Sequence, residues 1–191
     1  MNKIVYIIPG FGQQTKMSGY NKLLKFFKTK KFKVVSVKIS WKNKVMSNYI
    51  DEFSKQLTHQ KEDEVYLFGF SLGAMIAFIS AEKINPKVLL LASLSPYFKE
   101  DLKFVRESWK NFLGKKRIED FKNFSFTKLA KKIDCKTFLF AGETEVKELF
   151  RRVEDANKNL KHSELFIIKN TKHDISQKEY LNKLEEIINT L

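Results

Sequence analysis

Residues 65–79 constrain the fold of this chain more than any other stretch. The short apolar run Val65–Phe68 predicts a buried strand, and the almost wholly apolar segment Ala74–Ala81 predicts a buried helix. Between them stands Gly-Phe-Ser-Leu-Gly at positions 69–73. This spacing is typical of a nucleophile elbow, in which a serine occupies a strained turn and the residues two places away have no room for a side chain. The N-terminal amides of the following helix would then point at charge that develops on Ser71.

Two glycines around a serine also recur by chance. In that case Gly69 merely ends a strand and Gly73 relieves packing of the helix. The flanking strand and helix are what an elbow requires, so we interpret Gly69 and Gly73 as elbow glycines and Ser71 as a nucleophile.

Apolar runs and helical stripes alternate from one end of the chain to the other. Strands are expected at residues 4–8, 33–39, 65–68, 87–92, 137–141 and 165–168, and helices at 20–27, 46–57, 74–81, 146–153 and 176–191. The last helix is expected to begin with a capping box at Ser176–Glu179. Helices between consecutive strands favour parallel pairing with helices on both faces. The sequence therefore predicts one α/β domain over residues 1–191, a three-layer α/β/α sandwich around a mostly parallel sheet of about six strands.

Residues 96–132 interrupt this alternation because they are longer than an ordinary connection between secondary-structure elements. Apolar positions from Phe98 to Phe112 recur at helical spacing and end at Gly114, and a basic segment follows at 115–117. We expect one long helix and one short one from this small helical insertion. It is either extra packed helix or a small cap over the site, and the sequence favours neither.

The composition suits a globular and strongly basic protein. Of its 191 residues 43% are hydrophobic, and its formal net charge is +14. Residues 1–50 contain eleven lysines and no Asp or Glu, a surface that would attract nucleic acid or anionic lipid. However, only four of the 36 basic residues are arginine, the type expected where phosphates are bound in bidentate fashion. A coding bias toward lysine explains this pattern better, so we expect no specific nucleic-acid partner.

Apolar run length and cysteine usage bear on the compartment. No apolar run approaches the roughly 20 residues of a membrane-spanning helix. The N-terminal run at residues 4–8 is too short for a signal peptide. The single cysteine, Cys135, excludes an internal disulfide framework and is expected to be a small buried residue. We therefore expect a cytoplasmic protein without a transmembrane segment, and the sequence leaves its oligomeric state open.

A serine nucleophile needs a base, and the base needs a carboxylate that orients it. In an open parallel sheet both groups are expected at the carboxyl ends of the strands, where ligands bind. His59 is expected to be exposed at the end of a helix, and His162 precedes the last strand and so lies at the opposite edge. His173 follows the last strand and is the one histidine expected beside Ser71.

Four acidic residues are candidates for the orienting carboxylate. Glu143 and Glu145 follow the fifth expected strand, and Glu100 and Asp101 come after the fourth. A carboxylate at position 143 or 145 could instead cap the next helix, where its charge is favourable. The residue pattern by itself leaves the choice open.

The order Ser71, Glu145, His173, together with the elbow at 69–73, resembles the α/β-hydrolase family over nearly the whole chain. In that family the acid usually stands three residues after the glycine that ends its strand, the position of Glu145 relative to Gly142. The resemblance implies that Ser71, Glu145 and His173 form a catalytic triad, with Glu in place of the commoner Asp.

Residues 9–12, Pro-Gly-Phe-Gly, resemble the oxyanion loop of the same family, with proline where a histidine is often found. By this match the backbone N–H groups of Phe11 and Leu72 would hold the oxyanion. The structural alternative is an ordinary strand-to-helix turn. Larger relatives begin with two further strands, so the resemblance implies a minimal, six-stranded and all-parallel version of the fold. It implies no metal or organic cofactor, and the Cys and His residues lack the spacing of a zinc site.

Two aromatic residues, Trp41 and Tyr97, follow strands on the side of the site and are candidate pocket residues, although loop aromatics often only pack. The function we expect is a serine hydrolase that cleaves a carboxylic ester or thioester of a small molecule, with a preference for short acyl groups. Acyl transfer or peptide hydrolysis with the same triad is the closest alternative. A non-catalytic protein that binds nucleic acid or lipid through its basic surface belongs to another class.

Overall fold

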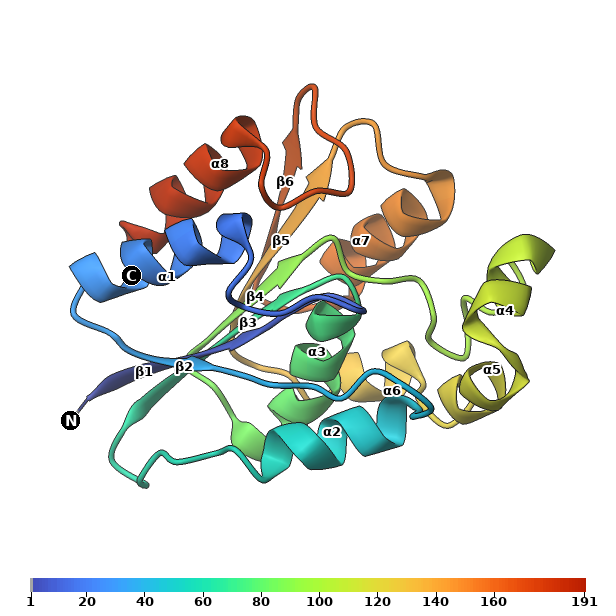
Figure 1. The fold of residues 1–191 in the computed structure, drawn as a ribbon, viewed down its shortest axis with the longest axis horizontal. Coiled ribbons are helices and arrows are strands. Elements are labelled where there is room, and N and C mark those ends of the chain that lie inside the picture. The colour runs from blue at the N-terminus through green and yellow to red at the C-terminus, as the bar shows by residue number, and fades with distance from the viewer. Residues whose placement is uncertain (1) are drawn as a thin grey trace.

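The protein forms a six-stranded, all-parallel sheet (Figure 1), and the computed structural model describes residues 2–191. The strands are β1 (Lys3–Ile8), β2 (Lys33–Ser36), β3 (Glu64–Phe70), β4 (Val88–Ala92), β5 (Lys136–Gly142) and β6 (Ser163–Ile168). Their order across the sheet is β2-β1-β3-β4-β5-β6, and every neighbouring pair is parallel. The predicted α/β architecture around about six parallel strands is confirmed.

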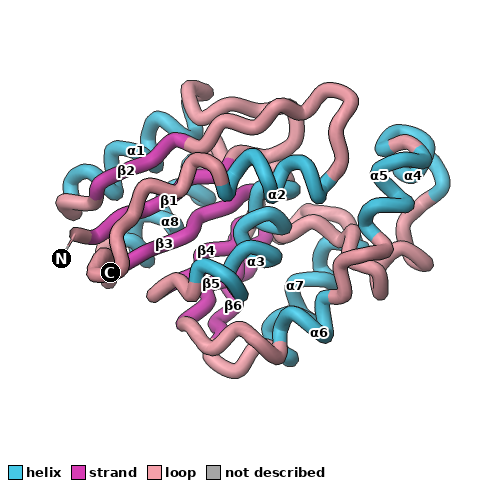
Figure 2. The backbone as a smooth tube through the Cα atoms, turned by 90° about the horizontal axis from the view of Figure 1, so that it is seen from below, coloured by secondary structure: helices cyan, strands magenta, loops and turns pink. Residues whose placement is uncertain are grey.

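Helices cover both faces of the sheet (Figures 1 and 2). They are α1 (Ser18–Thr29), α2 (Met46–Ser54), α3 (Leu72–Ile84), α4 (Glu107–Leu113), α5 (Lys115–Phe121), α6 (Phe126–Ala130), α7 (Lys147–Asn159) and α8 (Lys178–Ile188). Buried residues of α1 and α8 pack on one face, and those of α2, α3 and α7 pack on the other. The short helices α4, α5 and α6 belong to the segment between β4 and β5.

Side chains of the strands alternate between the two helical layers, as the pleat of a strand requires. In β1, Ile4, Tyr6 and Ile8 join the core beneath α2 and α3, whereas Val5 and Ile7 join the core beneath α1 and α8. Both sets are buried. Burial on both faces explains why the strands are continuously apolar in sequence rather than alternating.

The chain reverses its direction of travel across the sheet between β1 and β3. It moves from β1 to β2 at one edge, returns to β3, and continues through β4 and β5 to β6. Ligands of open parallel sheets bind at such a point, outside the carboxyl ends of the strands. Here the loop of residues 9–13 follows β1 and the turn at Ser71 follows β3, and both line one cavity.

The segment 96–132 differs from its prediction. The helix expected from Phe98 to Phe112 begins only at Glu107, and three short helices replace the expected long and short pair. Phe98 is fully buried whereas Phe112 is 73% exposed, so the apolar stripe does not lie on one packed face.

Two carboxylates explain why the beginning of this segment forms turns instead of helix. Asp101 accepts a hydrogen bond from the N–H of Phe98, and Glu100 accepts one from the N–H of Phe126. Side chains that satisfy backbone groups in this way compete with helix formation. A pattern of apolar spacing carries no record of these contacts, so periodicity overestimates the helix.

The remaining differences lie at the ends of elements. β2 ends at Ser36 rather than at residue 39, and the last helix begins at Lys178 and ends at Ile188. The expected capping box is not formed, because the Ser176 hydroxyl donates to Asp174 instead (2.7 Å). Among residues 2–191, no helix combines the length and the apolarity needed to cross a bilayer.

Candidate active site

Ser71 occupies a strained turn between β3 and α3. Its backbone has φ 57° and ψ −122°, a positive φ that residues other than glycine adopt rarely. The glycines on either side are required by close packing. A Cβ on Gly69 would collide with the backbone of Gly73, and a Cβ on Gly73 would collide with the carbonyls of Ile8 and Pro9. The turn is thus pressed against the end of β1, which places Ser71 beside the loop that follows β1.

The hydroxyl of Ser71 is hydrogen-bonded to His173. The distance from Ser71 Oγ to His173 Nε2 is 2.9 Å. The imidazole is held from behind by the ring of Phe70, whose centroid lies 4.9 Å away. The side chain of His173 is 45% exposed, so the serine–histidine pair is open to a ligand.

Glu145 is the carboxylate that contacts His173. Its Oε2 lies 2.8 Å from His173 Nδ1, and its side chain is only 1% exposed. A carboxylate at Nδ1 favours the tautomer with the proton on Nδ1, which leaves Nε2 free to accept the hydrogen of Ser71.

The other oxygen of Glu145 is fixed by two further donors. Oε1 accepts the N–H of Gly142 (2.8 Å) and the hydroxyl of Ser93 (2.7 Å). The Ser93 hydroxyl has a single hydrogen, which it donates to Glu145. The Tyr180 hydroxyl, whose oxygen lies 2.8 Å from Ser93 Oγ, therefore donates to Ser93. Complete burial raises the pKa of Tyr180 well above its ordinary value, so this hydroxyl keeps its proton. The buried carboxylate is therefore hydrogen-bonded throughout.

Glu143, the alternative acid, has a different position. Its Oε2 accepts the N–H of Asn170 (2.9 Å), in the loop that leads from β6 to His173. Thr171 in turn accepts both the N–H and the hydroxyl of Thr144 (2.9 and 2.8 Å). Glu143 thus holds the histidine loop against the acid loop and leaves the histidine itself to Glu145. Glu100 and Asp101 bind backbone groups in the insertion and do not contact His173.

The two N–H groups expected to bind an oxyanion lie beside Ser71. Phe11 and Leu72 both line a cavity that Ser71 and His173 also line. Leu72 is the first residue of α3, where backbone donors have no partner within the helix. Within residues 2–191, neither the N–H of Phe11 nor that of Leu72 donates a hydrogen bond to a protein acceptor. Both donors are therefore available to a ligand.

Two cavities meet at Ser71, and Ser71, Tyr97 and His173 line both of them. The acid-side lobe has a volume of about 310 Å³ and is walled by Pro96, Trp109, Val146, Leu149 and Lys172, among others. The loop-side lobe has a volume of about 270 Å³ and is walled by Gly10, Phe11, Phe70, Phe112 and Leu113, among others.

Of the two predicted pocket residues, Tyr97 lines both lobes, but the prediction for Trp41 is wrong. Trp41 lines neither lobe. Its indole donates to the carbonyl of Gln13 (3.1 Å) and packs edge-on against Phe11 (ring centroids 5.5 Å apart). Trp41 therefore supports the loop after β1 from behind instead of facing a ligand.

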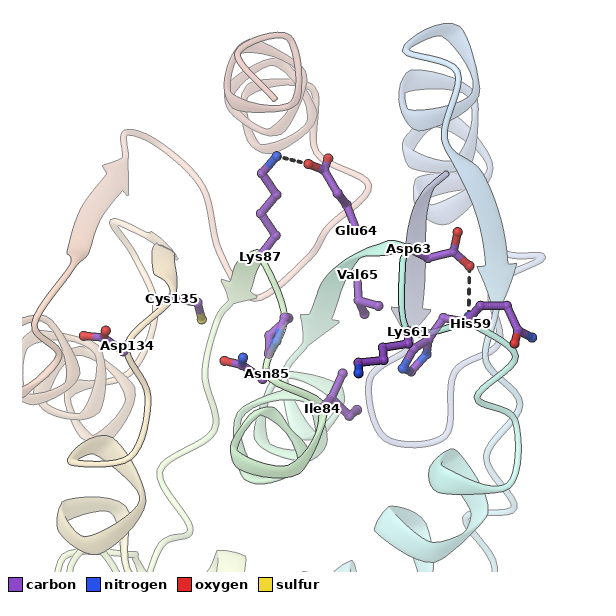
Figure 3. A pocket seen from close by; sticks show the side chains of 12 residues that line it. His59, Lys61, Asp63, Glu64, Val65, Ile84, Asn85, Lys87, Asp134 and Cys135 are labelled. Atoms are coloured by element: carbon purple, nitrogen blue, oxygen red, sulfur yellow. Dashed lines mark hydrogen bonds and ion pairs between the residues drawn. The ribbon is translucent and has the colours of Figure 1, made fainter. Parts of the chain in front are cut away.

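A larger cavity, of about 620 Å³, lies at the opposite edge of the sheet, where β3, β4 and β5 begin (Figure 3). Its charged groups include the ion pair of Lys87 with Glu64. Its histidine, His59, is half-buried rather than exposed as predicted, because Nδ1 contacts the Tyr6 hydroxyl (3.1 Å). Burial raises the pKa of the Cys135 thiol, which favours the unreactive protonated form. Among the described residues of this cavity no nucleophile is hydrogen-bonded to a histidine.

Several residues of the site were not anticipated from sequence. Ser93 and Tyr180 fix the carboxylate, and Ser95 Oγ lies 3.3 Å from Ser71 Oγ. Ser93 follows β4 directly, so its place at the carboxyl edge was a signal that could have been used. Trp109 and Phe112 belong to α4. The position of this helix beside the site depends on tertiary contacts, and no local sequence pattern indicates that position.

The arrangement can activate a hydroxyl for attack on a carbonyl and can bind the negative charge that results. A base contacts the hydroxyl, a buried carboxylate contacts the base, and two backbone donors lie beside it. Within residues 2–191, no group of three or more His, Cys, Asp or Glu side chains is placed to hold a metal ion.

Comparison with known proteins gives a consistent picture of the fold. No family model and no curated protein sequence matches the chain significantly. Solved structures do match. A putative hydrolase from Agrobacterium vitis has a TM-score of 0.84 and 12% identity, over 99% of this chain and 87% of that one. Est1E from Butyrivibrio proteoclasticus has a TM-score of 0.81 and 12% identity, over 99% and 86%. The chain has the α/β-hydrolase fold.

A dienelactone hydrolase from Anabaena variabilis has the same fold, with a TM-score of 0.70 and 14% identity over 99% of this chain and 84% of that one. These identities are low enough that the likeness concerns the arrangement of the backbone. The geometry of this chain's own residues must therefore carry the functional argument.

Proposed function

We propose that this α/β-hydrolase-fold protein is a serine hydrolase that cleaves a carboxylic ester or thioester of a small molecule through an acyl-enzyme. The observation that carries the proposal is the continuous relay from Ser71 Oγ to His173 Nε2 (2.9 Å) and from His173 Nδ1 to Glu145 Oε2 (2.8 Å), at the meeting point of two cavities.

In the acylation step, Ser71 Oγ attacks the carbonyl carbon while His173 Nε2 takes its proton. The carbonyl oxygen becomes an oxyanion that accepts hydrogen bonds from the N–H groups of Phe11 and Leu72. When the tetrahedral intermediate collapses, the bond to the leaving group breaks and His173 returns the proton to the departing alcohol or thiol. The serine ester remains.

In the deacylation step, water replaces the leaving group. His173 removes a proton from the water as it attacks the ester of Ser71, and the same imidazole then protonates Ser71 to release the acid. Glu145 keeps the imidazole in the reactive tautomer and stabilises its transient positive charge. Because this carboxylate is buried and held by Ser93 and Gly142, it does not need to reorganise during the reaction.

The size of the two lobes supports a compact substrate. A cavity of about 150 Å³ is enough to bind benzene. Lobes of about 310 and 270 Å³ therefore accommodate a short chain or a single ring on each side of the carbonyl. Longer chains gain roughly 0.8 kcal/mol per CH₂ only while cavity wall remains to receive them. We accordingly expect a preference for short acyl groups and no activation by lipid interfaces.

The test is turnover of p-nitrophenyl esters and matched thioesters of increasing acyl length by the wild-type protein and by Ser71→Ala. We expect kcat/KM to peak at short acyl groups, and the serine variant to be inactive on the whole series. Equal turnover by Ser71→Ala would refute the proposal. A maximum at long chains, or a jump in rate above the micellar concentration, would refute the compact substrate class.

A further inference from the structure

An arginine of the insertion contacts the structure that supports the loop after β1. Arg117, in α5, directs its guanidinium at three acceptors from different parts of the chain. Nη2 donates to the carbonyl of Trp41 (3.0 Å), Nη1 to the carbonyl of Leu113 (2.9 Å) and Nε to the hydroxyl of Tyr49 (3.2 Å). The group is half-buried, and within residues 2–191 it forms no ion pair. Its contacts therefore fix geometry rather than neutralise charge.

The same guanidinium also lies over the ring of Phe11, with Cζ 5.0 Å from the ring centroid. Trp41 contacts that ring as well, with centroids 5.5 Å apart. The Phe11 side chain is thus held between a cation and an indole, and the cation is bonded to the backbone of the residue that bears the indole. Contacts of an aromatic ring with a cation and with another ring both stabilise the position of that ring.

The rest of the loop is fixed by other contacts. The N–H of Gly10 donates to the hydroxyl of Tyr20 (2.9 Å), and the N–H of Gln13 donates to the carbonyl of Gly10 (2.9 Å). Between these two contacts, the N–H of Phe11 donates no hydrogen bond to another residue within residues 2–191. Its position thus depends on its side chain, which Arg117 and Trp41 hold.

We propose that Arg117 is a positioning residue that braces the loop of residues 9–13 and so sets where the N–H of Phe11 points. The inference rests on the proposed function, in which that N–H binds the oxyanion. It also gives the insertion a role. α4 and α5 are a fixed support of the oxyanion loop and not a dispensable packed helix or a mobile lid.

Only a guanidinium meets all of these contacts at once. It is planar and presents several N–H donors in a fixed fork, whereas the ammonium of lysine is a point charge that cannot reach three separated acceptors and stack on a ring together. Oxyanion donors act on the transition state more than on the ground state, so misplacing Phe11 should lower kcat and leave KM nearly unchanged.

The test compares Arg117→Lys and Arg117→Ala with a matched control, Arg106→Lys. Arg106 lies in the same insertion and binds Glu148 through two nitrogens (2.6 and 3.2 Å), but it does not contact the loop of residues 9–13. With p-nitrophenyl acetate we expect kcat of both Arg117 variants to fall about tenfold to a hundredfold, less than the loss of a whole donor. KM should stay within about twofold of wild type. Arg106→Lys should keep wild-type kcat, and guanidinium ion at sub-denaturing concentration should restore part of the kcat of Arg117→Ala.

Three results would overturn the inference: wild-type kcat in Arg117→Lys, the same loss in Arg106→Lys, or a loss in Arg117→Ala that guanidinium does not restore. Labelling of Ser71 by a fluorophosphonate, measured on the same preparations, separates this failure from failure of the proposed function. An unlabelled wild-type protein refutes the function itself. A labelled wild type with unaffected Arg117 variants refutes only the brace.

Discussion

The two edges of the sheet both carry a cavity, a histidine and a hydroxyl, but only at one of them does the histidine also contact a buried carboxylate among the described residues. At the carboxyl edge, His173 contacts the hydroxyl of Ser71 and a buried carboxylate. At the amino edge, His59 contacts the phenol of Tyr6. His59 and Cys135 line a larger cavity there (Figure 3), and burial raises the pKa of the Cys135 thiol. The larger cavity is therefore not the more informative one.

Chain direction explains the difference. At the carboxyl edge, loops lead from strands into helix N-termini, whose free N–H groups favour negative charge. Leu72 provides such a group directly after Ser71. At the amino edge, α3 ends instead, and Asn85, the residue that follows its last residue, adopts a left-handed conformation. The free backbone groups at this end of a helix are carbonyls, which are acceptors and cannot donate a hydrogen bond to an oxyanion. The ammonium of Lys87 is paired with Glu64 there.

The largest expected effect on kcat distinguishes Ser71, at the carboxyl edge, from Cys135, at the amino edge. Ser71→Ala should lower kcat about 10⁴-fold or more, because the relay loses the atom that attacks. Cys135→Ala removes the cysteine at the amino edge and should leave kcat within about twofold of wild type. Steady-state hydrolysis of p-nitrophenyl acetate measures both. A cysteine variant that loses activity while the serine variant keeps it would reverse our assignment of the two edges.

The second effect separates two carboxylates that stand two residues apart in one loop. Glu145→Gln should lower kcat about 10⁴-fold, because a neutral amide at His173 Nδ1 allows the wrong tautomer. Glu143→Gln removes only an acceptor for the N–H of Asn170, so a change of less than about tenfold is expected. The opposite ranking of the two variants would move the orienting role to Glu143.

These two carboxylates mark the limit of what the sequence predicts. The architecture followed from apolar periodicity, the choice of Ser71 from the glycine spacing around it between an expected strand and helix, and the choice of His173 from the directions of parallel strands. The choice of Glu145 needed a family resemblance, because spacing places both glutamates at the same edge. Ser93 and Tyr180 could not be connected to it in advance, since they approach from β4 and α8, far apart in the chain.

The third effect concerns the support of Glu145. Ser93→Ala removes a hydrogen bond to this carboxylate and leaves the Tyr180 hydroxyl without its short partner. We expect kcat to fall about tenfold through misplacement of the relay, and the free energy of unfolding to fall by about 1–3 kcal/mol. Ser80→Ala is the matched control, because the buried Ser80 hydroxyl has no hydrogen-bond partner among the described residues. An equal loss of kcat in the two variants would remove Ser93 from the site.

The smallest expected effect is on the pH dependence of the free energy of unfolding, for which we compare Asp101 with Asp63. Burial raises the pKa of Asp101, in the insertion, to about 6, and Arg152 opposes this shift only in part. Between about pH 4 and pH 6, Asp101 is protonated in the folded protein and ionised in the unfolded chain. The contribution of Asp101 to the free energy of unfolding therefore falls as pH rises through this range. At the amino edge the pKa of Asp63 is lowered by hydrogen bonds from the N–H groups of Gln60 and Asn2, so its contribution is lost as pH falls through its folded pKa.

The prediction can be checked by thermal unfolding at several pH values. Relative to wild type, Asp101→Asn should gain stability as pH rises from 4 to 6, because the variant no longer has a buried carboxylate to ionise. Asp63→Asn should lose stability relative to wild type over the acid range as pH rises. Parallel curves for wild type and Asp101→Asn would contradict the raised pKa.

The insertion at residues 96–132 shows most clearly why the sequence did not predict every contact of the site. Its apolar spacing predicted one long helix and one short one. Asp101 instead binds the nearby N–H of Phe98, and Glu100 binds the N–H of Phe126, 26 residues further along. The contacts of Arg117 join the insertion to Trp41 and Phe11, across more than 70 residues. Such long-range hydrogen bonds leave no local signature, and they explain why Trp41 was misassigned to the pocket wall.

The central claim, that Ser71 is an activated nucleophile at the carboxyl edge, is tested most directly by intact-mass spectrometry after treatment with a fluorophosphonate. The reagent adds covalently to a serine that a neighbouring base activates. We predict a single adduct on wild-type protein, located by peptide mapping to Ser71 and absent from Ser71→Ala. No adduct on the folded wild-type protein, or an adduct that persists in Ser71→Ala, would contradict the account.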